Sequence, residues 1–226
     1  PPRSTPSNSS AASDVYKRQG CIELIANTGT ITNTGTLDVS ANSTPTSGVR
    51  GGEVDIQGKY ILHKGNILAD GTDNTDAGDV NLSSTKATLL SKDSLISARG
   101  KGENSNGGNV LIWSDTNTYF REGALIDVRG GDISGDGGFV EISGKRSGFY
   151  NGNILTSATN GKRGRLLIDP DNVIISDADG TDNAELDDNE ILYADGGAVD
   201  FHITPAKIEG IDSNAVSYTH LRAHET

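Results

Sequence analysis

Acidic side chains in two stretches of the sequence could hold a calcium ion. Hard cations such as Ca²⁺ bind carboxylate and other oxygen ligands. The candidate ligands are Glu53, Asp73, Asp76, Asp79, Asp177, Asp179 and Asp182. Neither acidic loop has the EF-hand spacing, since Gly180 comes too early, and the glycine-rich calcium-roll repeat is missing. We therefore predict no metal or cofactor site, and keep calcium at these residues as an alternative.

Pairs of carboxylates at a fixed separation could also cleave glycosidic bonds. If the repeats described below stack, one outward column would contain Asp38, Leu68, Ser97 and Asp127, in which two coils without a carboxylate separate the acids. The next column would contain Asp70, Arg99 and Arg129, which fits a short charge ladder with Asp70 offsetting Arg99. Exposed ion pairs of this kind contribute about 0–1 kcal/mol. The sequence therefore predicts that the protein is not an enzyme.

The histidines and aromatic residues give no catalytic pattern. His63 and His202 lie in unrelated segments without nucleophile–base spacing, so we expect ordinary surface or turn histidines. Tyr119 and Phe120 are predicted to pack in the core. Trp113 follows an alternating apolar pair and is expected to point outward, where it could stack on a sugar.

Composition favours a repetitive β architecture over a helical bundle. The 226 residues include 29 Gly, 4 Phe, 1 Trp and no Met, and the net charge is −12. Nucleic-acid binding needs a basic surface, so this charge argues against it. No apolar run approaches the ~18 residues of a membrane span, so we expect no membrane insertion. Cys21 is the single cysteine and cannot form an internal disulfide.

Four segments of the chain are similar to one another: 51–71, 77–100, 107–130 and 137–159, with 21–41 as a looser copy. Each has three short apolar stretches. The first begins at Val54, Val80, Val110 and Val140, so the steps are 26, 30 and 30 residues. The middle stretch contains a bulky pair, such as Tyr119 and Phe120, and the third is built around isoleucine.

Three alternating strands per repeat, separated by Gly, Asn, Asp and Ser, indicate one coil of a parallel β-helix. The polar loops after the third strand vary in length and can project without breaking the stack. After residue 164 the period changes, and residues 184–194 and the segment after Thr204 read as short helices. The predicted fold is an all-β parallel β-helix (solenoid) with a small helical insertion near the C-terminal end.

Both ends of the chain read as translated DNA adapters. The stretch DVYKRQ (14–19) can be encoded by GAT GTG TAT AAG AGA CAG, and the reverse complement, read from its third base, encodes VSYTH, which occurs at 216–220. These ends resemble the transposase-type adapters of sequencing libraries. We therefore expect 1–19 and 216–226 to be adapter-derived and disordered, 20–176 to form the coils, and 177–215 to hold an acidic insertion and a truncated coil. Removing both ends changes the net charge from −12 to −14, and we expect an internal fragment of a longer protein.

The coil-forming motifs resemble a known family. The stretches GGNVLIWSD (107–115), GDGGFVEISGK (135–145) and NGKRGRLLIDPDNVIIS (160–176) are similar to the filamentous-haemagglutinin-like exoproteins and adhesins of two-partner secretion. The resemblance is strongest over 107–176 and weaker back to Gly20. It implies a right-handed parallel β-helix that is exported through an outer-membrane β-barrel transporter. No ligand-binding residue is implied, because the matching motifs form coils.

From the repeat and this resemblance we expect a structural shaft segment of a large secreted or surface-exposed bacterial adhesin. Host-cell or biofilm glycans and proteins are the expected partners, besides the transporter used in export. The alternative is a β-helical carbohydrate-active enzyme or glycan-binding module.

Overall fold

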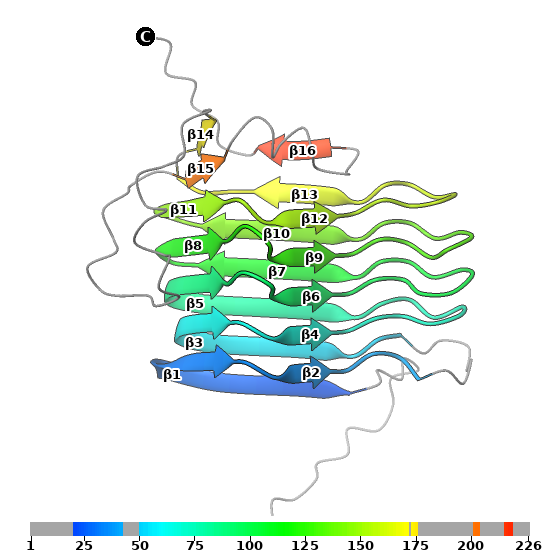
Figure 1. The fold of residues 1–226 in the computed structure, drawn as a ribbon, viewed down its shortest axis with the longest axis horizontal. Coiled ribbons are helices and arrows are strands. Elements are labelled where there is room, and N and C mark those ends of the chain that lie inside the picture. The colour runs from blue at the N-terminus through cyan, green and yellow to red at the C-terminus, as the bar shows by residue number, and fades with distance from the viewer. Residues whose placement is uncertain (1–19, 43–49, 172, 176–200, 204–214, 219–226) are drawn as a thin grey trace, which may run out of the picture.

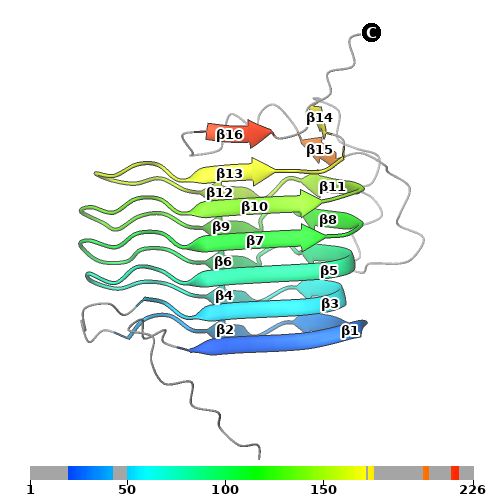
Figure 2. The ribbon, with the colours of Figure 1, turned by 180° about the vertical axis from the view of Figure 1, so that it is seen from behind.

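The computed structural model describes residues 20–42, 50–171, 173–175, 201–203 and 215–218 (Figure 1). All regular structure in these residues is β, and every strand pair is parallel. The chain winds through five coils and begins a sixth, each coil lying on the one before it. The rise and the direction of winding in Figures 1 and 2 make the solenoid right-handed. The predicted fold class is confirmed.

Each coil has three faces. The strands that begin a coil form the first face: β1 Cys21–Asn33, β3 Glu53–His63, β5 Asp79–Leu90, β7 Asn109–Ser114, β10 Phe139–Gly144 and β13 Arg165–Ile168. β1, β3 and β5 continue around the corner onto the second face, which later coils supply as separate strands: β8 Asn117–Phe120 and β11 Ser147–Tyr150. The third face contains β2 Thr36–Asp38, β4 Asn66–Leu68, β6 Leu95–Ser97, β9 Leu125–Asp127 and β12 Asn153–Leu155.

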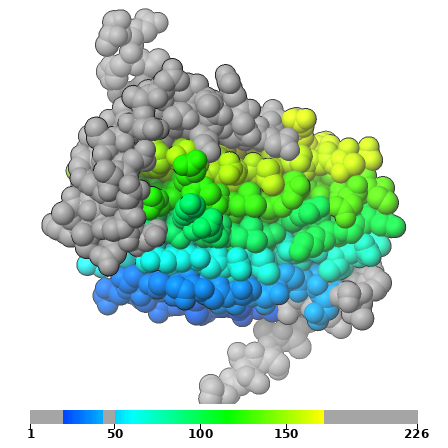
Figure 3. All heavy atoms as spheres, in the orientation of Figure 1, coloured from blue at the N-terminus to red at the C-terminus, as the bar shows by residue number. Residues whose placement is uncertain are grey.

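The interior is filled by columns of identical or similar side chains. Val54, Val80, Val110 and Val140 pair in register, as the repeat predicted, and all are fully buried. Ile67, Ile96, Ile126 and Ile154 form the matching column on the third face. Burying one such side chain contributes about 1.5–3 kcal/mol. The space-filling view shows the coils as successive layers from blue to yellow (Figure 3).

Glycine pairs allow the chain to turn tightly between the loops and the first face. A Cβ atom on Gly108 would overlap the carbonyl oxygen of Gly78 in the coil before, and one on Gly138 would overlap the carbonyl oxygen of Gly108. The Gly-Gly that begins several repeats is therefore required by the close approach of adjacent coils.

The bulky pair of the middle stretch is buried, as predicted, but its two residues belong to separate clusters. Tyr119 and Phe120 are both buried, but they point to opposite sides of β8, because adjacent residues of a strand alternate. Phe120 lies in the main core, where its ring meets that of Tyr150 edge to face at 5.3 Å. Tyr119 packs in a second cluster with Ala87, Leu89 and Phe149 on the other side of the sheet. Leu90, Phe120 and Tyr150 therefore fill the interior, whereas Leu89, Tyr119 and Phe149 pack in the second cluster.

The sixth coil is incomplete among the described residues. β14 Val173–Ile175 does not stack on β11, because β15 Phe201–Ile203 lies between them. The predicted helices at 184–194 and after Thr204 lie outside the described residues.

β16 Ala215–Tyr218 pairs with β13 in parallel (Figure 1). It includes residues 216–218 of the segment 216–226, for which we expected disorder, and only these three residues of that segment are described. Without β16, the edge of β13 that faces away from β10 would leave backbone groups unpaired, and such an edge accepts an extended segment through main-chain hydrogen bonds whatever its sequence. The segments 1–19 and 219–226 lie outside the described residues.

Candidate functional site

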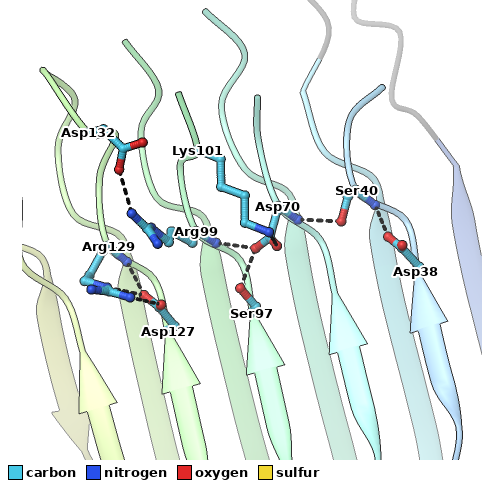
Figure 4. A network of polar contacts seen from close by, with 9 residues as sticks. All are labelled: Asp38, Ser40, Asp70, Ser97, Arg99, Lys101, Asp127, Arg129 and Asp132. Atoms are coloured by element: carbon cyan, nitrogen blue, oxygen red, sulfur yellow. Dashed lines mark hydrogen bonds and ion pairs between the residues drawn. The ribbon is translucent and has the colours of Figure 1, made fainter. Parts of the chain in front are cut away.

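A network of charged and polar groups lies where the third face meets the projecting loops (Figure 4). The predicted column is confirmed, because Asp38, Leu68, Ser97 and Asp127 pair in register on β2, β4, β6 and β9. Two coils without a carboxylate separate its acids. Asp38 and Asp127 each accept a hydrogen bond from the backbone N–H two residues later, at 2.9 and 3.1 Å. Both acids thus begin a turn into the loop.

Asp70 differs from the exposed ladder that the sequence predicted, because it is 1% exposed. Its Oδ1 accepts hydrogen bonds from the Ser97 hydroxyl and from the backbone N–H of Arg99 at 2.9 Å. The ammonium of Lys101 lies 2.6 Å from Oδ2. Arg99 therefore meets Asp70 through its backbone, while its guanidinium binds Asp132 at 2.7 Å. A buried carboxylate needs such partners to offset the loss of water.

Arg129 completes the network within its own coil. Its Nε and Nη2 donate to the two oxygens of Asp127 at 2.9 and 2.6 Å, which is a bidentate pair. The acids of this region are therefore held by N–H groups, a hydroxyl and cations. This arrangement can align one coil on the next and fix the start of each loop.

The projecting loops are themselves stacked by a ladder of Asp and Asn side chains. Asp76 accepts a hydrogen bond from the backbone N–H of Asn106, Asn106 from that of Asp136, and Asp136 from that of Lys162, at 2.8, 2.7 and 2.8 Å. Asp73 accepts the N–H of Glu103 in the same way. The loops project, as predicted, and they also bind their neighbours.

Four of the candidate calcium ligands belong to the described residues, where they lie in two places. Asp73 and Asp76 belong to the loop ladder. On the first face, Asp79 is bound by Arg50 and by the side-chain amide of Asn109, both at 2.8 Å, and Glu53 accepts a hydrogen bond from Asn81. Asp177, Asp179 and Asp182 lie outside the described residues. Among the residues that the structure describes, no three His, Cys, Asp or Glu side chains are grouped so that they could hold a metal ion.

His63 contradicts the prediction of a surface or turn histidine, because it is fully buried. It stands at the end of the second-face part of β3, in register with Leu90. Its Nε2–H donates to the carbonyl of Leu95 at 3.1 Å, so that Nδ1 accepts from the Asn33 amide at 3.2 Å. Burial lowers the pKa of His63 to about 4, although the Leu95 hydrogen bond acts in the opposite direction. The ring is therefore neutral near pH 7. His202 lies on β15, in register with Phe149.

Trp113 points outward from β7, as predicted, between Ser83 and Ser143 of the adjacent coils. Its Nε1–H donates to Asp115 at 3.2 Å. Polar residues inside the corner between the first two faces were not predicted. Ser84 bonds Thr88 at 2.8 Å and Ser114 at 3.0 Å. The recurrence of serine thirty residues apart was the signal available in the sequence.

The fold and these contacts define a class, a parallel β-solenoid with an apolar interior and hydrogen-bonded polar corners. Comparisons with protein-family models, with curated proteins and with solved structures find no match for the chain. The described residues contain no helix with the length and apolar character needed to cross a membrane.

Proposed function

We propose that the protein is a structural shaft segment of a large secreted or surface-exposed bacterial adhesin. The observation that carries the proposal is the continuous interior, in which one apolar cluster extends from Val39 to Ile168 through every described coil. Each coil adds about 4.8 Å to such a stack, and its backbone is paired with the coils on both sides. A stack of this kind resists bending and can hold another part of a longer chain away from a surface.

The surface contacts support the same role. Side chains that could react are instead used in bonds between coils, as for Asp70, Asp76 and Asn106. The acidic surface favours solubility and opposes self-association. Export through an outer-membrane β-barrel transporter is part of the proposal, and it rests on the coil motifs at 107–176. Because a solenoid coil contacts mainly its neighbours, coils can fold one after another as the chain emerges.

Export is testable by placing the chain between a two-partner secretion-recognition domain and an epitope tag in a Gram-negative host. We expect the tag in the medium or on the surface only when the partner transporter is present. A matched variant with Ile112→Asp in the interior should still be exported but be degraded by added protease. Retention of the tag inside the cell with the transporter present would contradict the proposed export.

The shaft role is tested separately by incubating the purified chain with a panel of polysaccharides and measuring reducing ends. We expect no increase above a heat-treated control. Depolymerisation of any substrate would contradict a purely structural role and favour the carbohydrate-active alternative.

A further inference from the structure

A surface pocket of about 420 Å³ lies where the loops enter the first face at the last coils. It is formed at the starts of β7, β10 and β13, which lie one above another in Figure 2. Its side chains come from Asn109, Asp136, Phe139, Lys162, Arg163 and Arg165, and the glycines of the stacked corner complete it. This volume lies in the range of small-molecule sites.

The pocket is lined by three cations, although the chain as a whole is acidic. The outward column of the first face reads Glu53, Asp79, Asn109, Phe139 and Arg165 in register, so it changes from acidic to basic along the stack. Lys162, Arg163 and Arg165 place three cations within four residues of a chain whose net charge is −12. Neither Lys162 nor Arg165 forms an ion pair with a carboxylate of the described residues, in contrast to Arg50, Arg99 and Arg129.

Arg165 is held in place without losing its hydrogen-bond donors. Its guanidinium carbon lies 5.3 Å from the centre of the half-buried Phe139 ring. This cation–π contact uses the charge of the side chain and leaves its N–H groups for a ligand. A guanidinium can bind a carboxylate through two parallel hydrogen bonds, which a lysine cannot do.

The remaining groups of the pocket favour an anion that also carries hydroxyl groups over a small inorganic anion such as phosphate or sulfate. Asp136 uses Oδ1 for the N–H of Lys162, and its second oxygen can accept a hydroxyl hydrogen bond. Asn109 donates its amide to Asp79, so that its carbonyl oxygen is the group offered to a ligand. A carboxylate and a carbonyl at the rim repel phosphate or sulfate but accept hydroxyl groups. Sugar acids combine both requirements.

We propose that this pocket binds an acidic polysaccharide, with Arg165 and Lys162 on a sugar carboxylate and Asp136 and Asn109 on neighbouring hydroxyl groups. The site goes beyond the shaft role and does not depend on how the protein is exported. Because the chain as a whole is acidic, the attraction is local, within a screening distance of about 10 Å. Binding therefore selects chains that place a carboxylate directly in the pocket.

Calorimetry of the full chain with tri-galacturonate, neutral tri-galactose, inorganic phosphate and sulfate tests the proposal. We expect saturable binding of the uronate alone. Arg165→Gln and Lys162→Gln should each weaken it about tenfold, while Arg165→Lys should restore part of the loss from Arg165→Gln. Arg146→Gln removes an exposed arginine outside the pocket and should change nothing. Unchanged melting temperatures show that the variants fold.

Three results would overturn the proposal. One is that calorimetry detects no binding of tri-galacturonate at concentrations up to about 10 mM, since a weaker dissociation constant would not describe a useful site. Another is binding that survives both Arg165→Gln and Lys162→Gln. The third is phosphate or neutral sugar binding as tightly as the uronate, since the pocket would then not recognise a sugar acid.

Discussion

The two ends of the described stack use the same coil positions differently. In the half formed by β1–β4, Asn33 and His63 occupy one interior column, which continues as Leu90, Phe120 and Tyr150 in the later coils. In β1 the interior residues Ile22 and Leu24 are only half-buried, whereas their equivalents in β7 are fully buried. An apolar residue at a given coil position is therefore fully buried only where neighbouring coils cover it.

This comparison predicts a large difference between equivalent truncations. Ile112 and Leu24 belong to one column, on β7 and β1. Ile112→Ala should lower the free energy of unfolding by about 4 kcal/mol through lost burial and a cavity, and Leu24→Ala by about 1–2 kcal/mol. Denaturant titration measures both. Equal losses would mean that the first coil is as well packed as the fourth.

The buried polar column predicts sensitivity to acid. The pKa of His63 is about 4 in the fold and near 6.5 in the unfolded chain, so the unfolded state binds the proton more readily. Stability is complete above pH 6.5 and falls as the pH drops from 6.5 to 4, by about 3 kcal/mol at most. A protonated Nδ1 would also face the Asn33 amide, whose oxygen already accepts the N–H of Gly35.

The measurement is the free energy of unfolding against pH for the protein and for His63→Gln. The difference between the two curves isolates this histidine from the carboxylates. If the curves run parallel between pH 6.5 and 4, burial does not set its proton affinity.

A smaller effect separates two aspartates in one column. Asp127→Ala removes a bidentate partner of Arg129 and an acceptor for its N–H, and should cost about 1.5 kcal/mol. Asp38→Ala removes only the acceptor for the Ser40 N–H at an exposed position and should cost about 0.5 kcal/mol or less. Thermal melts of the two variants compare them. A larger loss of stability for Asp38→Ala than for Asp127→Ala would contradict this comparison of their contacts.

The smallest change concerns the loop ladder. Asn106→Ala deletes the acceptor of the Asp136 N–H and should cost about 1 kcal/mol or less. Its effect should be local, so hydrogen exchange should quicken at Asp136 and stay unchanged at Val110 and Val140. Faster exchange throughout the coils would show that the loops hold the core together.

Sequence periodicity predicted the interior because buried valines and isoleucines recur at fixed steps. It missed His63, because this residue lies outside the apolar stretches of the repeat and histidine is not an apolar residue type. It misjudged Asp70, because burial of a carboxylate depends on Ser97 and Lys101 of the following coil. Contacts between coils depend on register, and a single repeat does not contain that information.

The pocket at Arg165 was not predicted for the same reason. Its side chains come from residues 109 to 165 and meet only after three coils have stacked. The sequence suggested the acidic loops as candidate ligand sites, yet Asp73 and Asp76 accept hydrogen bonds in the ladder between loops. Residue type alone does not separate a ligand from a structural acceptor.

The in-register stack is the central claim, and a spin–spin distance tests it most directly. Glu23 and Glu141 lie in one outward column, four strand spacings and about 19 Å apart, although 118 residues separate them in sequence. After Cys21→Ser, nitroxide labels at both positions should give a narrow distribution near 20 Å, widened only by the label arms. A broad distribution centred beyond about 35 Å would contradict the stack.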